Sequence, residues 1–135
     1  MNQIAYKSGF KYQLAEPYEA MTGITGYDVD TDYFTFMSSG LLYINKGYAW
    51  DGPSGPTFDS RNFMRGSLEH DCFYQAIRLG LLPKEFKIIA DRRLHAVCIE
   101  DGMCRIRAWW ILKGLEVGGK SSTLPSHRQK ILFAP

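Results

Sequence analysis

The stretch YAWDGPSGPTFDS, residues 48–60, constrains the fold more than any other part of the chain. Its two glycines and two prolines are incompatible with a regular helix or strand. Before it, the sequence is rich in aromatic, β-branched and turn-forming residues, which is typical of short strands. After it, apolar residues recur with the period of a helix. The sequence therefore predicts an α+β fold, in which a small N-terminal antiparallel β-sheet is followed by three helices.

Two segments before this stretch are predicted to form the strands of the sheet. In DYFTFMSSGLLYINKGY, residues 32–48, two strand-like runs flank Ser38, Ser39 and Gly40, which predicts a β-hairpin. The segment KYQLAEPY, residues 11–18, predicts a further strand. Because Pro17 cannot donate a hydrogen bond to a neighbouring strand, we place this segment at a sheet edge.

Glycine and proline also set the limits of the three predicted helices. The first begins at Arg61 and is closed by Gly80, the second opens at Pro83 and ends at Gly102, and the third covers residues 103–117. The connection LGLLPKE between the first two is short. It must fold the second helix back against the first, as an antiparallel hairpin.

Length and composition indicate one folded domain. With 135 residues, of which 45% are hydrophobic, the chain can bury one core of useful size. We expect residues 1–119 to form a single α+β domain and residues 120–135 to form an extended C-terminal tail. No stretch approaches ~18 uninterrupted apolar residues, so we expect no transmembrane segment.

The charge of the chain bears on its partners. A formal net charge of +2 is too small to favour nucleic-acid binding. Basic residues do gather after Gly102, which indicates either a solvated face or a weak attraction to the phosphates of lipid or nucleic acid.

The three cysteines, Cys72, Cys98 and Cys104, show no metal-type spacing such as C-x-x-C. All three lie in predicted helices, so we interpret them as small apolar core residues of a protein made in a reducing cytoplasm. Trp109 and Trp110 are flanked by arginines. We expect at least one of them to pack in the core, and the alternative is an anchor at a membrane interface.

The segment SLEHDCFYQAI, residues 67–77, places two adjacent polar residues, His70 and Asp71, in an otherwise apolar helical pattern. Across the predicted hairpin, His70 and Asp91 stand at similar distances from the turn. We place Asp91 on an apolar stripe with Ile88, Leu94 and Cys98, so we expect its carboxylate to be buried. A buried carboxylate needs hydrogen-bond partners.

His70 and Tyr74 are the partners in position for Asp91. A carboxylate that binds one nitrogen of an imidazole fixes the tautomer and leaves the other nitrogen as a base. His70, Asp91 and Tyr74 are therefore the candidate catalytic residues. The same three residues also fit a structural polar network that fixes the helix pair.

Asp71 points in a different direction from His70, by about 100° around the helix. It faces the glycine and proline stretch if that stretch packs beside the start of the helix. Asp51 and the carbonyls around Gly52 and Gly55 then join Asp71 as oxygen ligands. Such a set suits a hard cation, calcium before magnesium.

The order of four motifs resembles a family of small phage and prophage proteins known as a domain of unknown function. The motifs are WDGPSGP, HDCFY, the pair Ala90 and Asp91, and AWWILKGLEVGG, and together they cover roughly residues 45–119. The resemblance implies a phage or prophage origin, with synthesis in the host cytoplasm and incorporation into the virion. The apolar end of RQKILFAP, residues 128–135, would suit docking onto other phage structural proteins.

The helix GSLEHDCFY and the segment ADRRL are similar to phospholipase A2, especially the disulfide-free form carried on parvovirus capsids. The resemblance implies that His70 activates water, that Asp91 orients His70 and that Tyr74 hydrogen-bonds Asp91. It also implies that Asp71 binds calcium.

In the same family, a glycine-rich calcium loop precedes this helix. Gly52 precedes His70 by the family's interval, so Gly52 and Gly55 would supply loop carbonyls or an oxyanion amide. The function that follows is a calcium-dependent hydrolysis of a phospholipid ester. The alternative is a non-catalytic virion, tail or assembly protein, in which the same residues are structural.

Overall fold

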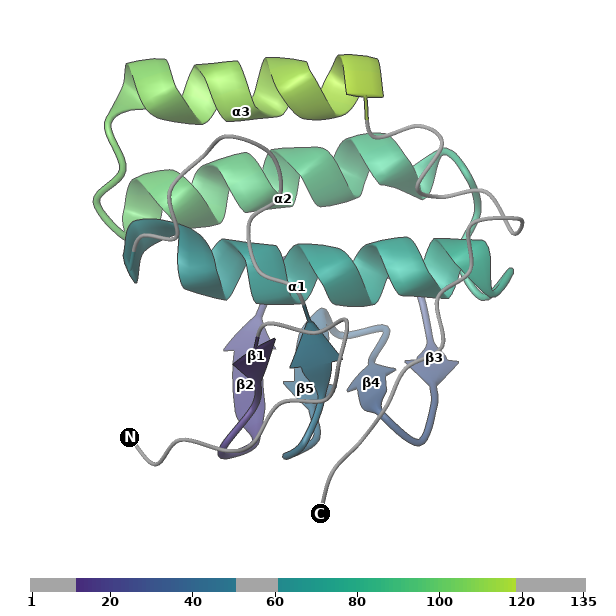
Figure 1. Cartoon of the computed structure of the whole chain (residues 1–135). Coiled ribbons are helices and arrows are strands. Elements are labelled where there is room, and N and C mark those ends of the chain that lie inside the picture. The colour runs from purple at the N-terminus through teal and green to yellow at the C-terminus, as the bar shows by residue number, and fades with distance from the viewer. Residues whose placement is uncertain (1–11, 51–60, 119–135) are drawn as a thin grey trace. The chain divides into compact units, whose positions relative to one another are not determined.

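The computed structural model describes residues 12–50 and 61–118, which fall into two compact units. The first unit holds the strands and the second holds the helices (Figure 1). The chain thus has the predicted order of small antiparallel sheets followed by three helices, and the α+β class is confirmed.

The first unit contains one sheet of four strands and one pair of strands. The strands are β1 (Tyr12–Gln13), β2 (Tyr18–Met21), β3 (Val29–Asp30), β4 (Phe34–Phe36), β5 (Leu41–Ile44) and β6 (Ala49–Trp50). The larger sheet has the order β2-β5-β4-β3, and β1 pairs with β6; every pairing is antiparallel. The prediction that residues 48–60 contain no strand is wrong at Ala49 and Trp50, which form β6.

The predicted hairpin is formed by β4 and β5. Its turn contains Gly40, whose φ of +99° is a backbone conformation that favours glycine. A Cβ atom at Gly40 would also lie 3.3 Å from the backbone of Gly23 and Ile24. The prediction of one edge strand over residues 11–18 is only partly right, because Tyr12–Gln13 form β1 while Tyr18 begins β2. Pro17 directly precedes β2, which is an edge strand of the larger sheet.

The second unit consists of α1 (Arg61–Arg78), α2 (Phe86–Glu100) and α3 (Arg105–Gly118). Gly80 and Gly102 follow the first two helices with φ values of +76° and +99°, as expected for glycines that end helices. The prediction that α2 opens at Pro83 is wrong by three residues. The amide of Phe86 bonds to the Pro83 carbonyl at 3.0 Å, so a tighter turn precedes the helix.

The first two helices form the predicted antiparallel hairpin, and they approach each other closely at Gly66. A Cβ atom there would lie 2.6 Å from Cδ1 of Leu94 and 3.2 Å from Sγ of Cys98. The third helix packs against α2 (Figure 1). A buried cluster joins the three helices and consists of Phe63, Leu94, Cys98, Met103 and Ala108, with Ile99, Ile111 and Leu115 packed against it.

Two predictions of burial on these helices are wrong. Ile88 is 58% exposed, because the buried face of α2 is centred near Ala90 and Leu94, roughly 130° around the helix from Ile88 at ~100° per residue. Cys72 and Cys98 are buried as expected, but Cys104 is exposed just before α3.

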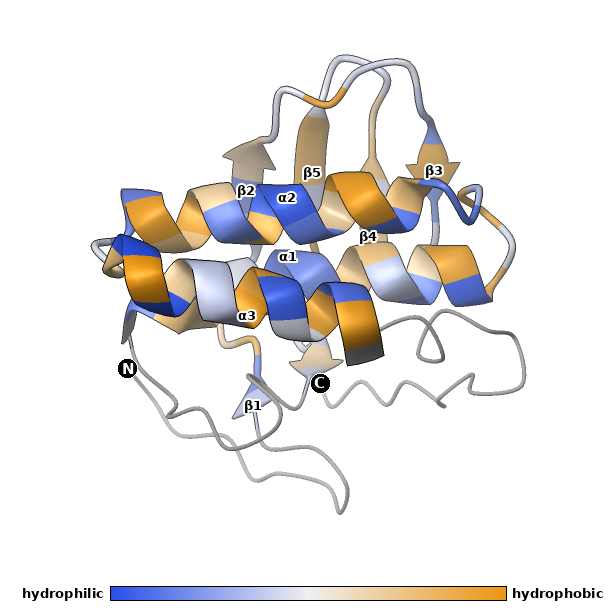
Figure 2. Cartoon of the chain, turned by 90° about the horizontal axis from the view of Figure 1, so that it is seen from above, coloured by the Kyte–Doolittle hydropathy of each residue, from blue (hydrophilic) through white to orange (hydrophobic). Residues whose placement is uncertain are grey.

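The expectation that a tryptophan of α3 packs in the core is also wrong. Trp109 and Trp110 are 48% and 66% exposed. Smaller side chains, those of Ala108, Ile111 and Leu115, occupy the inner side of the helix instead. Figure 2 shows apolar as well as polar residues around α3. None of the helices in the described part of the chain is long and apolar enough to cross a membrane.

Candidate functional site

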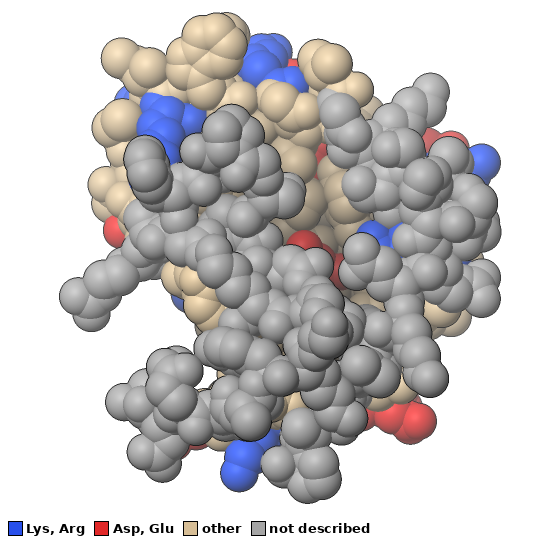
Figure 3. Space-filling view, in the orientation of Figure 1, with Lys and Arg blue, Asp and Glu red and all other residues tan. Residues whose placement is uncertain are grey.

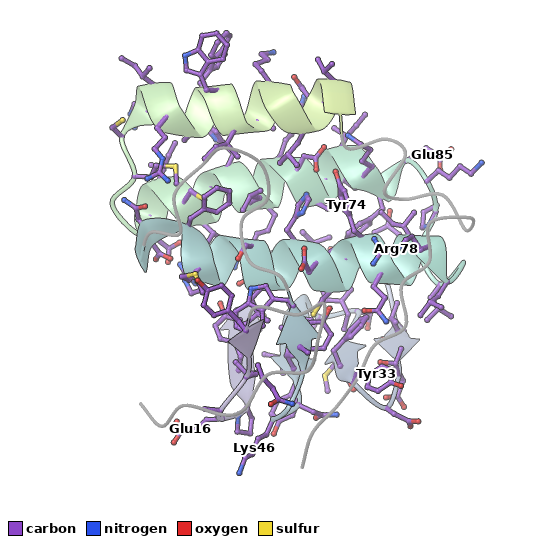
Figure 4. The ribbon with its side chains drawn as sticks, viewed as in Figure 1. Glu16, Tyr33, Lys46, Tyr74, Arg78 and Glu85 are labelled. Carbon is purple, nitrogen blue, oxygen red and sulfur yellow. The ribbon has the colours of Figure 1, made fainter. Side chains whose placement is uncertain are left out.

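The hairpin of α1 and α2 brings His70, Tyr74 and Asp91 together. Nε2 of His70 lies 2.7 Å from Oδ1 of Asp91, and the hydroxyl of Tyr74 donates to the same oxygen at 2.5 Å. His70 and Tyr74 are one helical turn apart on α1, so both side chains reach one acceptor on α2. Tyr74 is visible between the two helices in Figure 4.

A fourth residue, Lys87, completes this cluster, although it was not predicted from the sequence. Its Nζ atom lies 2.8 Å from Oδ2 of Asp91 and donates to the carbonyl of Leu115 in α3 at 2.9 Å. The signal in the sequence was the spacing, because a lysine four residues before an aspartate on a helix can pair with it. Both carboxylate oxygens of Asp91 therefore have partners.

The surroundings of Asp91 keep it ionised, although it is only 1% exposed. Burial alone raises the pKa of its carboxyl group. Hydrogen bonds from His70, Lys87 and Tyr74 outweigh this effect, and they hold the pKa below its usual value. At neutral pH Asp91 is consequently a carboxylate that accepts hydrogen bonds.

The surroundings of His70 keep it neutral. Burial lowers its pKa below the ordinary value, and the positive charges of Lys87 and Arg78 act in the same direction. The hydrogen bond to Asp91 opposes this shift but does not reverse it. A neutral imidazole facing a carboxylate carries its proton on Nε2, so Nδ1 holds the basic lone pair.

Tyr74 stays a hydrogen-bond donor. Burial raises the pKa of its hydroxyl group, and the bond to the charged Asp91 raises it further. The ring of Tyr74 also lies against that of His70, with centroids 3.9 Å apart. Tyr74 can thus fix both the carboxylate and the imidazole without taking part in proton transfer.

The predicted calcium site lies mostly outside the described residues. Asp51, Gly52 and Gly55 fall in residues 51–60, which the structure does not describe, and Asp71 is partly exposed on α1. Within residues 12–50 and 61–118, no group of three or more His, Cys, Asp or Glu side chains is arranged to hold a metal ion. The calcium site stays a prediction.

Two further charged pairs join α1 to α2, and sequence reasoning missed both. Glu69 is 1% exposed and accepts from Nε and Nη2 of Arg93, at 2.8 and 3.2 Å. Arg65 binds Asp101 through Nε and Nη2, at 3.0 and 2.9 Å. Together with the His70 cluster, these pairs form a row of polar contacts along the hairpin, and they fix its register.

No family model matches the chain, and neither the curated proteins nor the solved structures include a significantly similar one. The resemblances to the phage family and to phospholipase A2 therefore rest on the sequence motifs.

Proposed function

We propose that this chain is a phage or prophage protein that hydrolyses a phospholipid ester, with His70 as the general base. The observation that carries the proposal is the contact between Nε2 of His70 and the ionised Asp91, at 2.7 Å. It leaves Nδ1 of a neutral imidazole as the proton acceptor. The substrate class comes from the similarity of the HDCFY helix and the facing Asp91 to phospholipase A2.

In the proposed reaction, Nδ1 of His70 takes a proton from a water molecule as the water oxygen attacks the ester carbonyl. The imidazolium ion that forms is stabilised through its Nε2–H group by the Asp91 carboxylate. The bond to the alcohol oxygen then breaks, and His70 returns the proton to that oxygen. Such general-base assistance contributes ~10²–10⁴-fold in rate.

Tyr74 and Lys87 act as positioning residues in this mechanism. Each donates to one oxygen of Asp91, so the carboxylate cannot rotate away from His70. Asp71, Asp51, Gly52 and Gly55 are the residues proposed to hold calcium. When bound, the ion would polarise the ester carbonyl as a Lewis acid.

The proposal is tested with the wild-type protein on mixed micelles of detergent and phosphatidylcholine or phosphatidylglycerol. We expect release of free fatty acid in the presence of calcium, and a fall in the rate when the calcium is chelated. Measured release at the level of a protein-free blank, for both lipids and with calcium present, would contradict the proposal. Activity that survives chelation would show that the reaction does not need calcium. The role of His70 as the base would then remain in the proposal.

A second function, that of a non-catalytic virion, tail or assembly component, is favoured by a specific observation. Lys87 occupies the second oxygen of Asp91 and ties it to the carbonyl of Leu115 in α3, so the cluster links three helices. For this function, the wild type has no esterase activity. His70→Ala then lowers only the free energy of unfolding, by ~1–3 kcal/mol, because a buried acceptor loses its partner.

A further inference from the structure

The outer side of α3 carries apolar side chains that are exposed and lie outside the buried cluster of the described residues. Four side chains form it: Ile106, Trp109, Trp110 and Val117, which are 74%, 48%, 66% and 87% exposed. At ~100° per residue these four positions lie on the side opposite the inward-facing Ala108 and Leu115. We call these four residues the α3 outer face.

We propose that the α3 outer face binds the surface of a phospholipid membrane. Tryptophan is suited to this position, because its ring is apolar while its N–H group is polar, and the two ends match the acyl and headgroup sides of the interface. With 14 residues, α3 is ~21 Å long at ~1.5 Å per residue, shorter than the ~30 Å hydrocarbon core. It is therefore expected to lie in the plane of the membrane surface.

The charges around this face complement the phosphates of lipid headgroups. Arg105 precedes Ile106 and is exposed, Arg107 follows it and donates to Asn62 at 3.4 Å, and Lys113 lies 5.7 Å from the ring centroid of Trp109. Glu116 is the one acidic residue of α3, and Lys113 pairs with it at 3.1 Å. Figure 3 shows lysine or arginine groups among the uncharged side chains along the edge where α3 lies. At ~100° per residue Lys113 lies within this face and Arg105 beside its edge, where cations can attract the phosphates of lipid headgroups.

The size of the face argues against a second copy of the chain as its occupant. The exposed parts of the four side chains amount to roughly 500 Å² when an aromatic side chain contributes ~150–250 Å². A stable interface between two proteins takes ~800 Å² from each partner. A membrane surface needs no such minimum, because insertion of a few side chains is reinforced by attraction of the cations.

Sedimentation with lipid vesicles tests this proposal, and it does not depend on His70 or on ester hydrolysis. The wild type is mixed with vesicles of phosphatidylcholine and phosphatidylglycerol in equal amounts, and the bound fraction and the tryptophan emission are measured. We expect the protein to bind these vesicles and its tryptophan emission to shift to the blue. The bound fraction should be smaller on pure phosphatidylcholine and smaller at high salt.

The double variant Ile106→Ser/Trp110→Ser should bind these vesicles at least about tenfold more weakly, because each lost side chain removes apolar burial in the interface. The matched control is Ile88→Ser, which replaces an apolar side chain of α2 that is 58% exposed and outside this face. It should bind like the wild type. If the double variant loses its helical circular dichroism signal, the single variant Trp110→Ser replaces it in the binding measurement.

Three results would overturn the proposal. One is a wild-type protein that stays in the supernatant with anionic vesicles. Another is equal binding by the wild type and the face variants. The third is a wild-type dimer in analytical ultracentrifugation that Trp110→Ser dissociates, since the face would then belong to a second copy of the chain.

Discussion

Replacing His70 with glutamine is expected to lower the rate of phospholipid ester hydrolysis by ~10²–10⁴-fold, the contribution of a general base. The amide group of glutamine can still donate a hydrogen bond to Asp91, as Nε2 of His70 does at 2.7 Å. It has no basic nitrogen, however, and cannot accept a proton from water. The variant therefore removes the proposed chemistry while keeping a polar contact between α1 and α2.

The matched control is His95→Gln, which makes the same substitution on α2, one turn after Asp91. Its rate should stay within about twofold of the wild type, because the proposal gives His95 no part in proton transfer. Urea unfolding of both variants establishes that the fold is retained. A His70→Gln protein as active as His95→Gln would exclude His70 as the base.

Replacing Asp91 with alanine is expected to lower the free energy of unfolding by ~3–5 kcal/mol, which is the cost of removing one partner of a buried ion pair. The Lys87 side chain is 13% exposed and would keep the Leu115 carbonyl as an acceptor, but it would lose its ion-pair partner. His70 and Tyr74 would lose the oxygen they share. This effect is expected whether or not the cluster is catalytic.

Glu100→Ala is the control for this substitution, since it removes another carboxylate from α2. Glu100 pairs with Arg65 at 2.8 Å, but its side chain is 64% exposed. Exposed ion pairs contribute ~0–1 kcal/mol, so urea unfolding should show a small loss. Equal losses for Asp91→Ala and Glu100→Ala would mean that the His70 cluster does not stabilise the hairpin.

The meeting of His70, Tyr74 and Asp91 could be predicted because it follows from two local properties. Helical periodicity indicated which faces of α1 and α2 meet. The short connection after α1 required the two helices to run antiparallel. Positions equidistant from such a turn must face each other. The hairpin around Gly40 could be predicted for a similar reason, from a glycine between two short strands.

The Glu69–Arg93 pair could not be predicted in the same way, and the spacing of Lys87 and Asp91 allows their contact without requiring it. Long charged side chains reach several partners, and the choice depends on the rotation and register of the helices, which apolar periodicity gives only to within a residue or two. The exposure of Ile88 and of Trp109 was missed for a related reason. Hydrophobicity does not tell which side of a helix faces its neighbours when apolar residues occur on both sides, as they do on α3.

The central claim is that burial keeps His70 neutral and that Asp91 holds its proton on Nε2, which leaves Nδ1 as the base. NMR spectroscopy of the nitrogen-labelled imidazole of His70 at neutral pH tests it most directly, because the two ring nitrogens give distinct signals in each protonation state. We predict a neutral ring that is protonated at Nε2 and unprotonated at Nδ1, with a pKa below the ordinary value of 6.5. An imidazolium ion at neutral pH, or a neutral ring with its proton on Nδ1, would contradict the claim.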